Sequence, residues 1–370
     1  MIYLDSAATT LEKPGCVSKA VLNAMMNCAS PGRGGHRAAA NAADVLYCCR
    51  ERAAKLFDVQ QPEDVILTHN ATHSLNIAIF TLVKPGGKVV ISGYEHNAVT
   101  RALHSIPDVE IIVVGSPLFD PESALTGFEA AVTKEVDAVI CNHVSNVFGF
   151  IQPIEQIAEL CRARGKRLII DASQSAGILP VSMTRLGAAF IAMPGHKGLY
   201  GPQGTGLLLC GMEPEPVLYG GTGSDSQLQS MPKYLPDRLE AGTQNVCGAA
   251  GLLAGMEFVS KFGLERVERN EKALCRYMTG LIKRIPGVRV FCGHEQSGVL
   301  SFVVEGKDCE VIGDRLARQG VAVRAGFHCA PLAHRTAGTQ GSGTVRISFS
   351  VFNTFRQLEY AAQAIEMAIR

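Results

Sequence analysis

The sequence predicts an α/β fold, in which a mostly parallel sheet covered by helices is followed by a smaller α+β part. Between residues 41 and 210, short apolar runs alternate with amphipathic helical stretches, as is typical of a sheet that is buried on both faces. The pattern then changes, because a region rich in glycine and proline over 211–248 precedes a long helical segment. We therefore predict a large domain over 15–250 and a small C-terminal domain over 251–370, with residues 1–14 packing near the small one.

The predicted strands of the large domain are short apolar runs, and the predicted helices lie between them. The strands read DVILT, GKVVISG, VEIIVVG, VDAVICN, KRLIIDAS, AAFIAMP and GTGLLLC in chain order. The helices include residues 41–56, 72–82 and 153–164. In the C-terminal part, the pattern predicts a helix over 249–284, strands in SGVLSFVVEG, GVAVRAG and GTVRISFS, and helices over 308–319 and from 354 onward.

The composition excludes several classes of partner. The chain of 370 residues has 35 Lys and Arg against 34 Asp and Glu, with 10 His, so it lacks the charge excess that nucleic acid or an anionic membrane attracts. The apolar runs are far shorter than the roughly 20 residues of a membrane span. The first ten residues show no signal-peptide pattern. We therefore expect a cytoplasmic protein that binds small molecules, with no nucleic acid and no membrane partner.

The 12 cysteines are scattered along the chain without a CxxC pair. This spacing suggests neither a metal site nor a disulfide framework, and we expect no metal. Most of the cysteines, such as Cys141 and Cys210, lie in apolar runs, where cysteine behaves as a small hydrophobic residue.

Polar residues directly follow several of the predicted strands, and ligands of open α/β sheets bind beyond the carboxyl ends of the strands. His96 follows VVISGYE, Asn146 follows VDAVICN, and Asp171 ends RLIID, with Gln174 three residues further on. Thr72 begins a helix whose free N–H groups and dipole favour a phosphate. A plain helix cap explains Thr72 or Asp171 equally well when each is taken alone.

Lys197 lies in the glycine-rich stretch GHKGLYGPQGTG, 26 residues after Asp171 and just after the strand AAFIAMP. A lysine among glycines is most often a solvated loop residue. The chain has no P-loop motif before a helix and no G-x-G-x-x-G after its first strand. A carboxylate, a phosphate site at a helix N-terminus, a histidine and a loop lysine together fit pyridoxal phosphate. Lys197 then holds the cofactor, and Asp171 keeps the ring nitrogen protonated.

A series of short segments runs in order over nearly the whole chain: YLDSAATT, EHNAV, HVSNVFG, IIDASQSAG, GHKGLYGPQGTG, EAGTQN, VRAGFHCAP and VRISFSVFNT. Together they resemble the class V aminotransferase family and, within it, the branch of cysteine desulfurases and selenocysteine lyases. The resemblance is closest to the second group of desulfurases. It implies the type I fold of PLP-dependent transferases, pyridoxal 5'-phosphate as cofactor, and a homodimer.

The resemblance also implies roles for individual residues. Lys197 is implied to hold the cofactor, while Asp171 pairs with the ring nitrogen and His96 stacks on the ring. The other residues implied to contact the cofactor are Ala71, Thr72, Asn146, Gln174, His196 and, toward the phosphate of the other subunit, Thr243. The residues implied to bind the substrate are Asn146, Arg346 and Arg324, with Arg346 as a bidentate fork for the carboxylate. Without the resemblance, Arg346 would be interpreted as an ordinary exposed strand arginine.

Cys329 lies in the segment RAGFHCAP, beside His328 and five residues after Arg324. Positive charge near this glycine- and proline-bounded loop favours the thiolate over the thiol. Taken alone, a cysteine here would more often be a packing residue. The resemblance implies instead that Cys329 is the nucleophile, since RAGFHCAP is similar to the R-x-G-H-H-C-A pattern of the second group, with Phe327 replacing a histidine.

Three positions depart from the family pattern. Pro194 stands where many relatives have a serine that donates to the phosphate, and proline has no N–H. Ala71 replaces a threonine, and Gly198 is an extra residue between Lys197 and LYGP. These departures predict a phosphate site that differs from that of most relatives.

The residues and the resemblance together predict a PLP-dependent cysteine desulfurase. It would convert L-cysteine to L-alanine, transfer the sulfur to Cys329 as a persulfide, and accept L-selenocysteine as another substrate. A sulfur or selenium acceptor protein is the further expected partner. The alternatives are a selenocysteine lyase proper, a class V aminotransferase or lyase in which Cys329 is not the acceptor, and a catalytically silent PLP-binding dimer.

Overall fold

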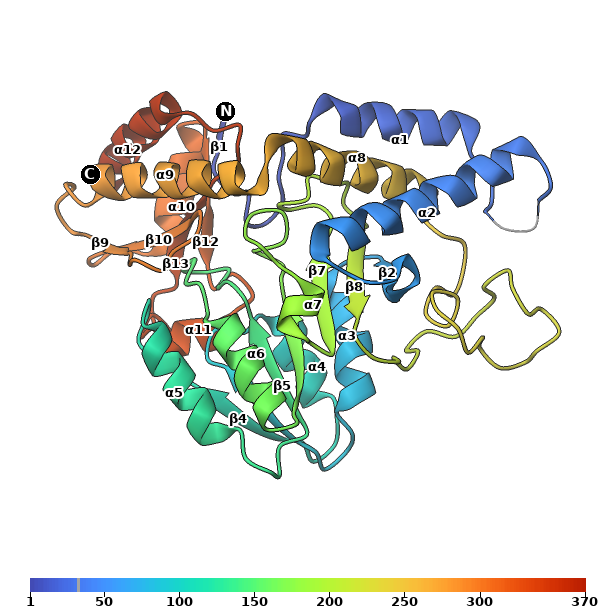
Figure 1. The fold of residues 1–370 in the computed structure, drawn as a ribbon. Helices are drawn as coiled ribbons and strands as arrows, with labels where there is room; N and C mark the ends of the chain where they lie inside the picture. The colour runs from blue at the N-terminus through green and yellow to red at the C-terminus, as the bar shows by residue number, and fades with distance from the viewer. Residues whose placement is uncertain (32–33) are drawn as a thin grey trace.

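A seven-stranded sheet with helices on both faces forms the larger part of the molecule in the computed structural model, which describes residues 1–31 and 34–370 (Figure 1). The strand order is β2-β8-β7-β6-β5-β3-β4, in which β8 is antiparallel to both neighbours and the other neighbours are parallel. The strands are β2 (Val65–Thr68), β3 (Lys88–Ser92), β4 (Glu110–Val114), β5 (Ala138–Asn142), β6 (Arg167–Asp171), β7 (Phe190–Pro194) and β8 (Gly206–Cys210). The predicted strands and the mostly parallel sheet are confirmed.

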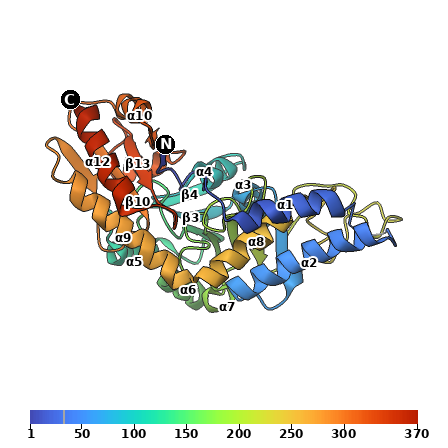
Figure 2. The ribbon, with the colours of Figure 1, turned by 90° about the horizontal axis from the view of Figure 1, so that it is seen from above.

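Two groups of helices cover the two faces of this sheet. One face packs against α3 (Ala71–Leu82) and α4 (Asn97–His104). The other face packs against α2 (Arg37–Phe57), α5 (Pro121–Ala131), α6 (Ile154–Ala163), α7 (Met183–Leu186) and α8 (Val246–Phe262). The three helices predicted between residues 41 and 164 are confirmed, with ends shifted by at most a few residues. The sequence pattern missed α1 (Gly15–Asn27), which lies along α8 (Figure 2), and the short helix η1 (Pro62–Asp64).

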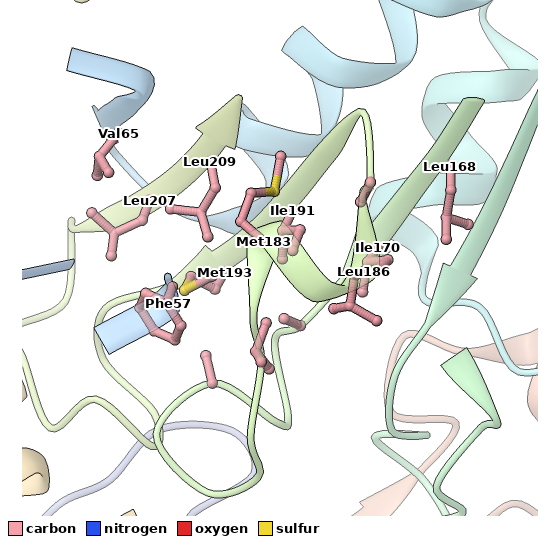
Figure 3. Close-up of a cluster of buried hydrophobic side chains, with 14 of the residues drawn as sticks. Phe57, Val65, Leu168, Ile170, Met183, Leu186, Ile191, Met193, Leu207 and Leu209 are labelled. Atoms are coloured by element: carbon pink, nitrogen blue, oxygen red, sulfur yellow. The ribbon is translucent and has the colours of Figure 1, made fainter. Parts of the chain in front are cut away.

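Alternate residues of each strand enter opposite hydrophobic clusters. In β7, Ile191 and Met193 join the cluster that contains Phe57 of α2, which Figure 3 shows in close-up. Phe190 and Ala192 join the cluster on the α3 and α4 side. Because both faces are buried, the strands consist of uninterrupted apolar runs, and this is the pattern that predicted them.

A second, antiparallel sheet with the order β12-β13-β10-β9 forms the C-terminal unit. Its strands are β9 (Val288–Phe291), β10 (Val299–Val304), β12 (Arg324–Gly326) and β13 (Thr344–Ser348). Its helices are α9 (Leu264–Ile282), α10 (Cys309–Arg318), α11 (Pro331–Thr336) and α12 (Phe355–Ile369). The predicted strands and the predicted helices near 308–319 and after 354 are confirmed, although GVAVRAG divides into β11 (Val321–Ala322) and β12.

The N-terminal strand β1 (Ile2–Tyr3) pairs in parallel with β11, so the start of the chain lies beside the C-terminal unit in both views (Figures 1 and 2). The segment that follows β1 then runs toward the large sheet, where the backbone N–H of Thr10 donates to the carbonyl of His196 at 3.1 Å. The division into domains at residues 250 and 251 stays a prediction.

The single helix predicted over 249–284 is wrong, because two helices, α8 and α9, meet at Gly263 with a bend of 82°. Gly263 has φ +93°, a conformation that cannot continue a helix and that only glycine adopts readily. Both helices are apolar on their buried sides, so the periodic pattern continues across the break and conceals it. Among residues 1–31 and 34–370, no single helix has the length and apolar composition to cross a membrane; the bent pair α8 and α9 satisfies that criterion together, by length and composition only.

The bend predicts opposite effects for two glycine substitutions. Gly263→Ala should lower the free energy of unfolding by about 1–3 kcal/mol, because alanine at this positive φ is strained. The nearest atom to the added methyl would be 4.0 Å away, so crowding plays no part. Gly280→Ala, at an exposed position in the last turn of α9, should instead add up to roughly 1 kcal/mol. Thermal unfolding of both variants measures this, and equal shifts would contradict the role given to Gly263.

Candidate active site

A cavity of about 210 Å³ lies at the carboxyl ends of the parallel strands, where the C-terminal unit meets the sheet. The predicted site residues that line it are Ala71, Thr72, His96, Asn146, Asp171, Gln174, His196, Lys197, Arg324, Cys329 and Arg346. The structure thus brings together residues from the large sheet, from two helix N-termini and from the C-terminal unit. Their individual roles stay predictions.

Thr243 is the predicted site residue that does not line this cavity. It is exposed, in the segment between β8 and α8 that has no regular secondary structure. The role of Thr243 toward the phosphate of the other subunit stays a prediction.

The backbone around Lys197 is fixed by the N-terminal segment. The carbonyl oxygen of His196 accepts hydrogen bonds from Thr10 Oγ1 at 3.0 Å and from Lys13 Nζ at 3.0 Å. Burial lowers the pKa of the Lys197 amine to about 8, although the negative charge of Asp171 opposes this effect. Lys197 is therefore a partly desolvated amine in a cavity and not a solvated surface lysine.

Asp171 ends β6 and is 5% exposed, so its carboxylate lies at the floor of the cavity. Its Oδ1 accepts a hydrogen bond from the backbone N–H of Ser173 at 2.9 Å, which caps a turn. Gln174 donates from Nε2 to the carbonyl of Ala7 at 2.9 Å. The amide nitrogen carries two hydrogens, so the second N–H of Nε2 and the Oε1 of Gln174 are both left to meet a ligand.

The cavity histidines are neutral at physiological pH. Burial lowers the pKa of His96 to about 4, and Nδ1 of His96 accepts a hydrogen bond from the N–H of Ala98 at 3.0 Å. The ring proton of His96 is therefore on Nε2. Burial likewise lowers the pKa of His196 to about 4 and that of His328 to about 2. The positive charge around the cavity comes from lysine and arginine side chains.

The N-terminus of α3 supplies backbone donors to the cavity. Asn70 is the N-cap of this helix and accepts from the N–H of His73 at 2.9 Å, so the interpretation of Thr72 as the N-cap is wrong. The N–H groups of Ala71 and Thr72 donate to no acceptor within the described part of the chain. They lie at the positive end of the helix dipole and suit an anion. Pro194 lines the same cavity and, as predicted from its chemistry, offers no N–H.

Arg346 is a buried cation in β13, so the interpretation of it as an exposed strand arginine is wrong. The side chain is 2% exposed and donates from Nη2 to Asp5 Oδ1 at 2.6 Å and from Nη1 to the carbonyl of Asn146 at 2.9 Å. Nε is buried and has no hydrogen-bond partner among the described residues. Arg324 lies directly across from Arg346 in β12 but is exposed, so the two guanidinium groups make this wall of the cavity positive.

Cys329 lies in the loop between β12 and α11 and is exposed, so the interpretation of Cys329 as a packing residue is wrong. The other exposed cysteines of the described chain, Cys16 and Cys48, lie in α1 and α2, outside the cavity. Cys329 and the preceding His328 have φ of 55° and 51°, which is the left-handed region that disfavours residues with side chains.

Sequence reasoning missed two carboxyl groups near the cavity. Asp5, the partner of Arg346, lies in the segment YLDSAATT. This segment contributes to the family resemblance, but the sequence alone predicts no role for Asp5. Glu95 precedes His96 and is fully buried, and its Oε1 accepts from the N–H of Asn142 at 2.7 Å. Burial, and then the nearby charge of Asp171, raise the pKa of Glu95 to about 8. Glu95 lies three residues beyond β3, and its place directly before His96 was the available signal.

The fold and the cavity define an α/β protein that can hold an anionic ligand at the ends of its sheet strands. The model of the family "Aminotransferase class-V" matches residues 2–360, and the chain belongs to this family. This confirms the family resemblance and the fold class. Proteins of this family use pyridoxal phosphate.

Curated relatives that cover nearly all of this chain carry the description "Probable cysteine desulfurase". The one from Mycolicibacterium paratuberculosis is 33% identical over 380 residues, a match that covers 99% of this chain and 55% of the relative. The one from Halalkalibacterium halodurans is 30% identical, with 99% of this chain and 92% of the relative covered. The chain thus spans little more than half of the first of these proteins and 60% of two further relatives.

Two solved structures are similar over almost their whole length. An apo cysteine desulfurase from Thermococcus onnurineus has a TM-score of 0.89 and 30% identity, with 100% of this chain and 94% of the other covered. The cysteine desulfurase CsdA from Escherichia coli, described as an S-sulfonic acid form, has a TM-score of 0.86 and 25% identity, with 99% and 94% covered.

The residues of the cavity fit pyridoxal phosphate. The free N–H groups at the start of α3 suit its phosphate, the Asp171 carboxylate suits the protonated ring nitrogen, and the Lys197 amine suits its aldehyde. Gln174 also fits, since the second N–H of its Nε2 can donate to the oxygen of the ring hydroxyl.

The lowered pKa of Lys197 predicts how the apoprotein takes up its cofactor. An amine must be neutral to attack an aldehyde, so the rate of covalent uptake should rise with pH through about 8. Asp171→Asn removes the carboxylate that raises the pKa of Lys197, so the midpoint should move to lower pH. The absorbance of bound cofactor over time gives both rates, with Lys197→Ala as the control that takes up none covalently. A midpoint that moves to higher pH in Asp171→Asn would contradict this electrostatic account.

Proposed function

We propose that this chain is a PLP-dependent cysteine desulfurase. It converts L-cysteine to L-alanine and retains the sulfur on Cys329 as a persulfide. The observation that carries the proposal is that an exposed cysteine, Cys329, shares one cavity with the partly desolvated Lys197 and the buried Arg346. The relatives described as cysteine desulfurases, which cover nearly the whole chain, support the same activity.

In this proposal the cofactor is held by side chains and backbone N–H groups that line the cavity. Lys197 binds its aldehyde, Asp171 faces its ring nitrogen, and the neutral ring of His96 stacks on it. The phosphate is bound by Ala71, Thr72 and His196, and by Thr243 of the other subunit of a homodimer. When bound, pyridoxal phosphate supplies an electron sink for the pair left by the departing α-proton.

Lys197 also moves protons in the proposed reaction. Once the substrate amine has displaced it, its free amine can accept the α-proton, because a pKa near 8 leaves a useful neutral fraction at physiological pH. The same group can return a proton to the product. Burial of the Lys197 amine limits its proton exchange with bulk water.

The substrate carboxylate binds at the wall formed by Arg346, Asn146 and Arg324. The guanidinium of Arg346 is already oriented by Asp5 and by the carbonyl of Asn146, and its unpartnered Nε leaves donor capacity for a carboxylate. A planar guanidinium can donate two parallel hydrogen bonds to a carboxylate, which a lysine cannot do.

The sulfur is transferred to Cys329. The Cys329 thiolate forms a bond to the substrate sulfur while the bond between that sulfur and Cβ of the substrate breaks, and Cβ takes up a proton. Cβ is reduced as the sulfur is oxidised, so no external oxidant is needed. The products are L-alanine and a persulfide on an exposed side chain, from which an acceptor protein can collect the sulfur.

The discriminating experiment uses Cys329→Ser with cysteine and with selenocysteine. A selenol leaves more readily than a thiol, so the variant should still form alanine from selenocysteine but lose almost all alanine formation from cysteine. Alanine release at equal enzyme concentration measures both, and Cys48→Ser, an exposed cysteine outside the cavity, is the matched control. If Cys329→Ser kept most of its cysteine activity, Cys329 would not be the sulfur acceptor.

Lys197→Ala tests the cofactor lysine separately. The variant should fold normally, because this side chain contributes chemistry rather than packing, yet turnover of cysteine should fall by on the order of 10²–10⁴-fold or more. Borohydride should no longer fix the cofactor to the chain. Turnover near the wild-type level without an added amine would show that another group does this work.

A further inference from the structure

The backbone on either side of Cys329 is tied to the large unit by two hydrogen bonds. The side-chain amide Nδ2 of Asn146 donates to the carbonyl of His328 at 2.8 Å, and both residues are buried. The backbone N–H of Asn97, at the start of α4, donates to the carbonyl of Cys329 at 2.8 Å. The loop that carries the cysteine is therefore attached to the elements that end the large sheet.

This loop is held in a conformation that it would not adopt by itself. His328 and Cys329 are consecutive residues with φ near +50°, and neither is a glycine. Residues with a Cβ disfavour this region, so external contacts must hold the pair there. If the bond to the carbonyl of His328 were lost, relaxation of this peptide would turn the Cys329 side chain to a new direction.

The backbone of Asn146 is in turn held by Arg346. Its carbonyl accepts from Nη1 of Arg346 at 2.9 Å, so two hydrogen bonds connect the guanidinium of Arg346 through Asn146 to His328. The side-chain Oδ1 of Asn146 is buried and has no partner among the described residues. The residue thus lies between the cation at the proposed carboxylate site and the peptide that precedes the nucleophile.

We propose that Asn146 is a positioning residue for Cys329. By fixing the carbonyl of His328, its amide holds the strained loop so that the Cys329 sulfur is aligned with a substrate whose carboxylate is bound at Arg346. This inference extends the proposed function. Its claim about sulfur transfer rests on that function. The link between Asn146 and the loop can also be tested without turnover.

The test variant is Asn146→Asp, which is nearly isosteric but has no hydrogen to donate to the carbonyl of His328. Asn27→Asp is the matched control, because its amide is exposed and bonds within α1. The first readout is the rate at which iodoacetamide alkylates Cys329 in the holoenzyme, measured by peptide mass spectrometry. Cys16 and Cys48 are internal references, since both are exposed and lie outside the cavity. We expect the Cys329 rate in Asn146→Asp to rise several-fold relative to these references.

The second readout is steady-state turnover of cysteine and selenocysteine. A residue that only bound the carboxylate would raise KM for both substrates and leave the ratio of their kcat values unchanged. A residue that positions Cys329 should lower kcat for cysteine by about tenfold more than kcat for selenocysteine, because sulfur transfer depends more strongly on the thiolate. Asn146→Ala, which removes the amide without adding a carboxylate, should show the same difference.

The inference requires both results, and an unchanged alkylation rate or an unchanged kcat ratio would overturn it. A failure of the proposed function is distinguishable from these outcomes. In that case the wild-type protein would form no alanine from cysteine, while the alkylation comparison would still decide whether Asn146 holds the loop.

Discussion

The buried guanidinium of Arg346 joins three segments that lie far apart in the chain, and the cavity depends on this junction. It pairs with Asp5 in the N-terminal segment and donates to the carbonyl of Asn146, which follows the interior strand β5. A buried cation is costly unless its charge is compensated and its hydrogen-bond donors find acceptors. These partners stabilise Arg346 in β13 while they bring the C-terminal unit against the ends of the large sheet. The wall of the cavity and the placement of the Cys329 loop both follow from that contact.

The distribution of charge in the cavity follows from burial. The histidines are neutral because burial lowers the pKa of each, and burial with the charge of Asp171 raises the pKa of Glu95 so that it retains its proton at neutral pH. Asp171 is the carboxyl group that is proposed to face the ring nitrogen of the cofactor. Lys197 has a lowered pKa in the same environment, which suits the roles of nucleophile and base that are proposed for its amine. The removal of water thus shifts the pKa values of the cavity histidines, of Glu95 and of Lys197.

Local patterns predicted those parts of the fold that depend on local burial. The strand β7 was recognisable because all of its residues are apolar, and both of its faces are covered. The break at Gly263 was not recognisable, since the residues on both sides continue a helical period and the sharp turn depends on one backbone angle. The alternative that Thr72 is a plain cap of α3 is wrong, because Asn70, two residues earlier, caps this helix, and Asn and Thr are both good N-cap residues.

The sequence by itself determined the strand end at which Asp171 stands, the place of His96 shortly after another strand, the glycine-rich turn around Lys197, and the family to which the chain belongs. These features depend on residue type and on spacing over a few tens of residues. Only the tertiary structure decided that Asp5 pairs with Arg346, 341 positions away, and that Asn146 holds the peptide before Cys329, 182 positions from it. Such contacts depend on how separate layers pack, and the pKa values near them depend on how much water that packing excludes. A one-dimensional pattern contains neither quantity.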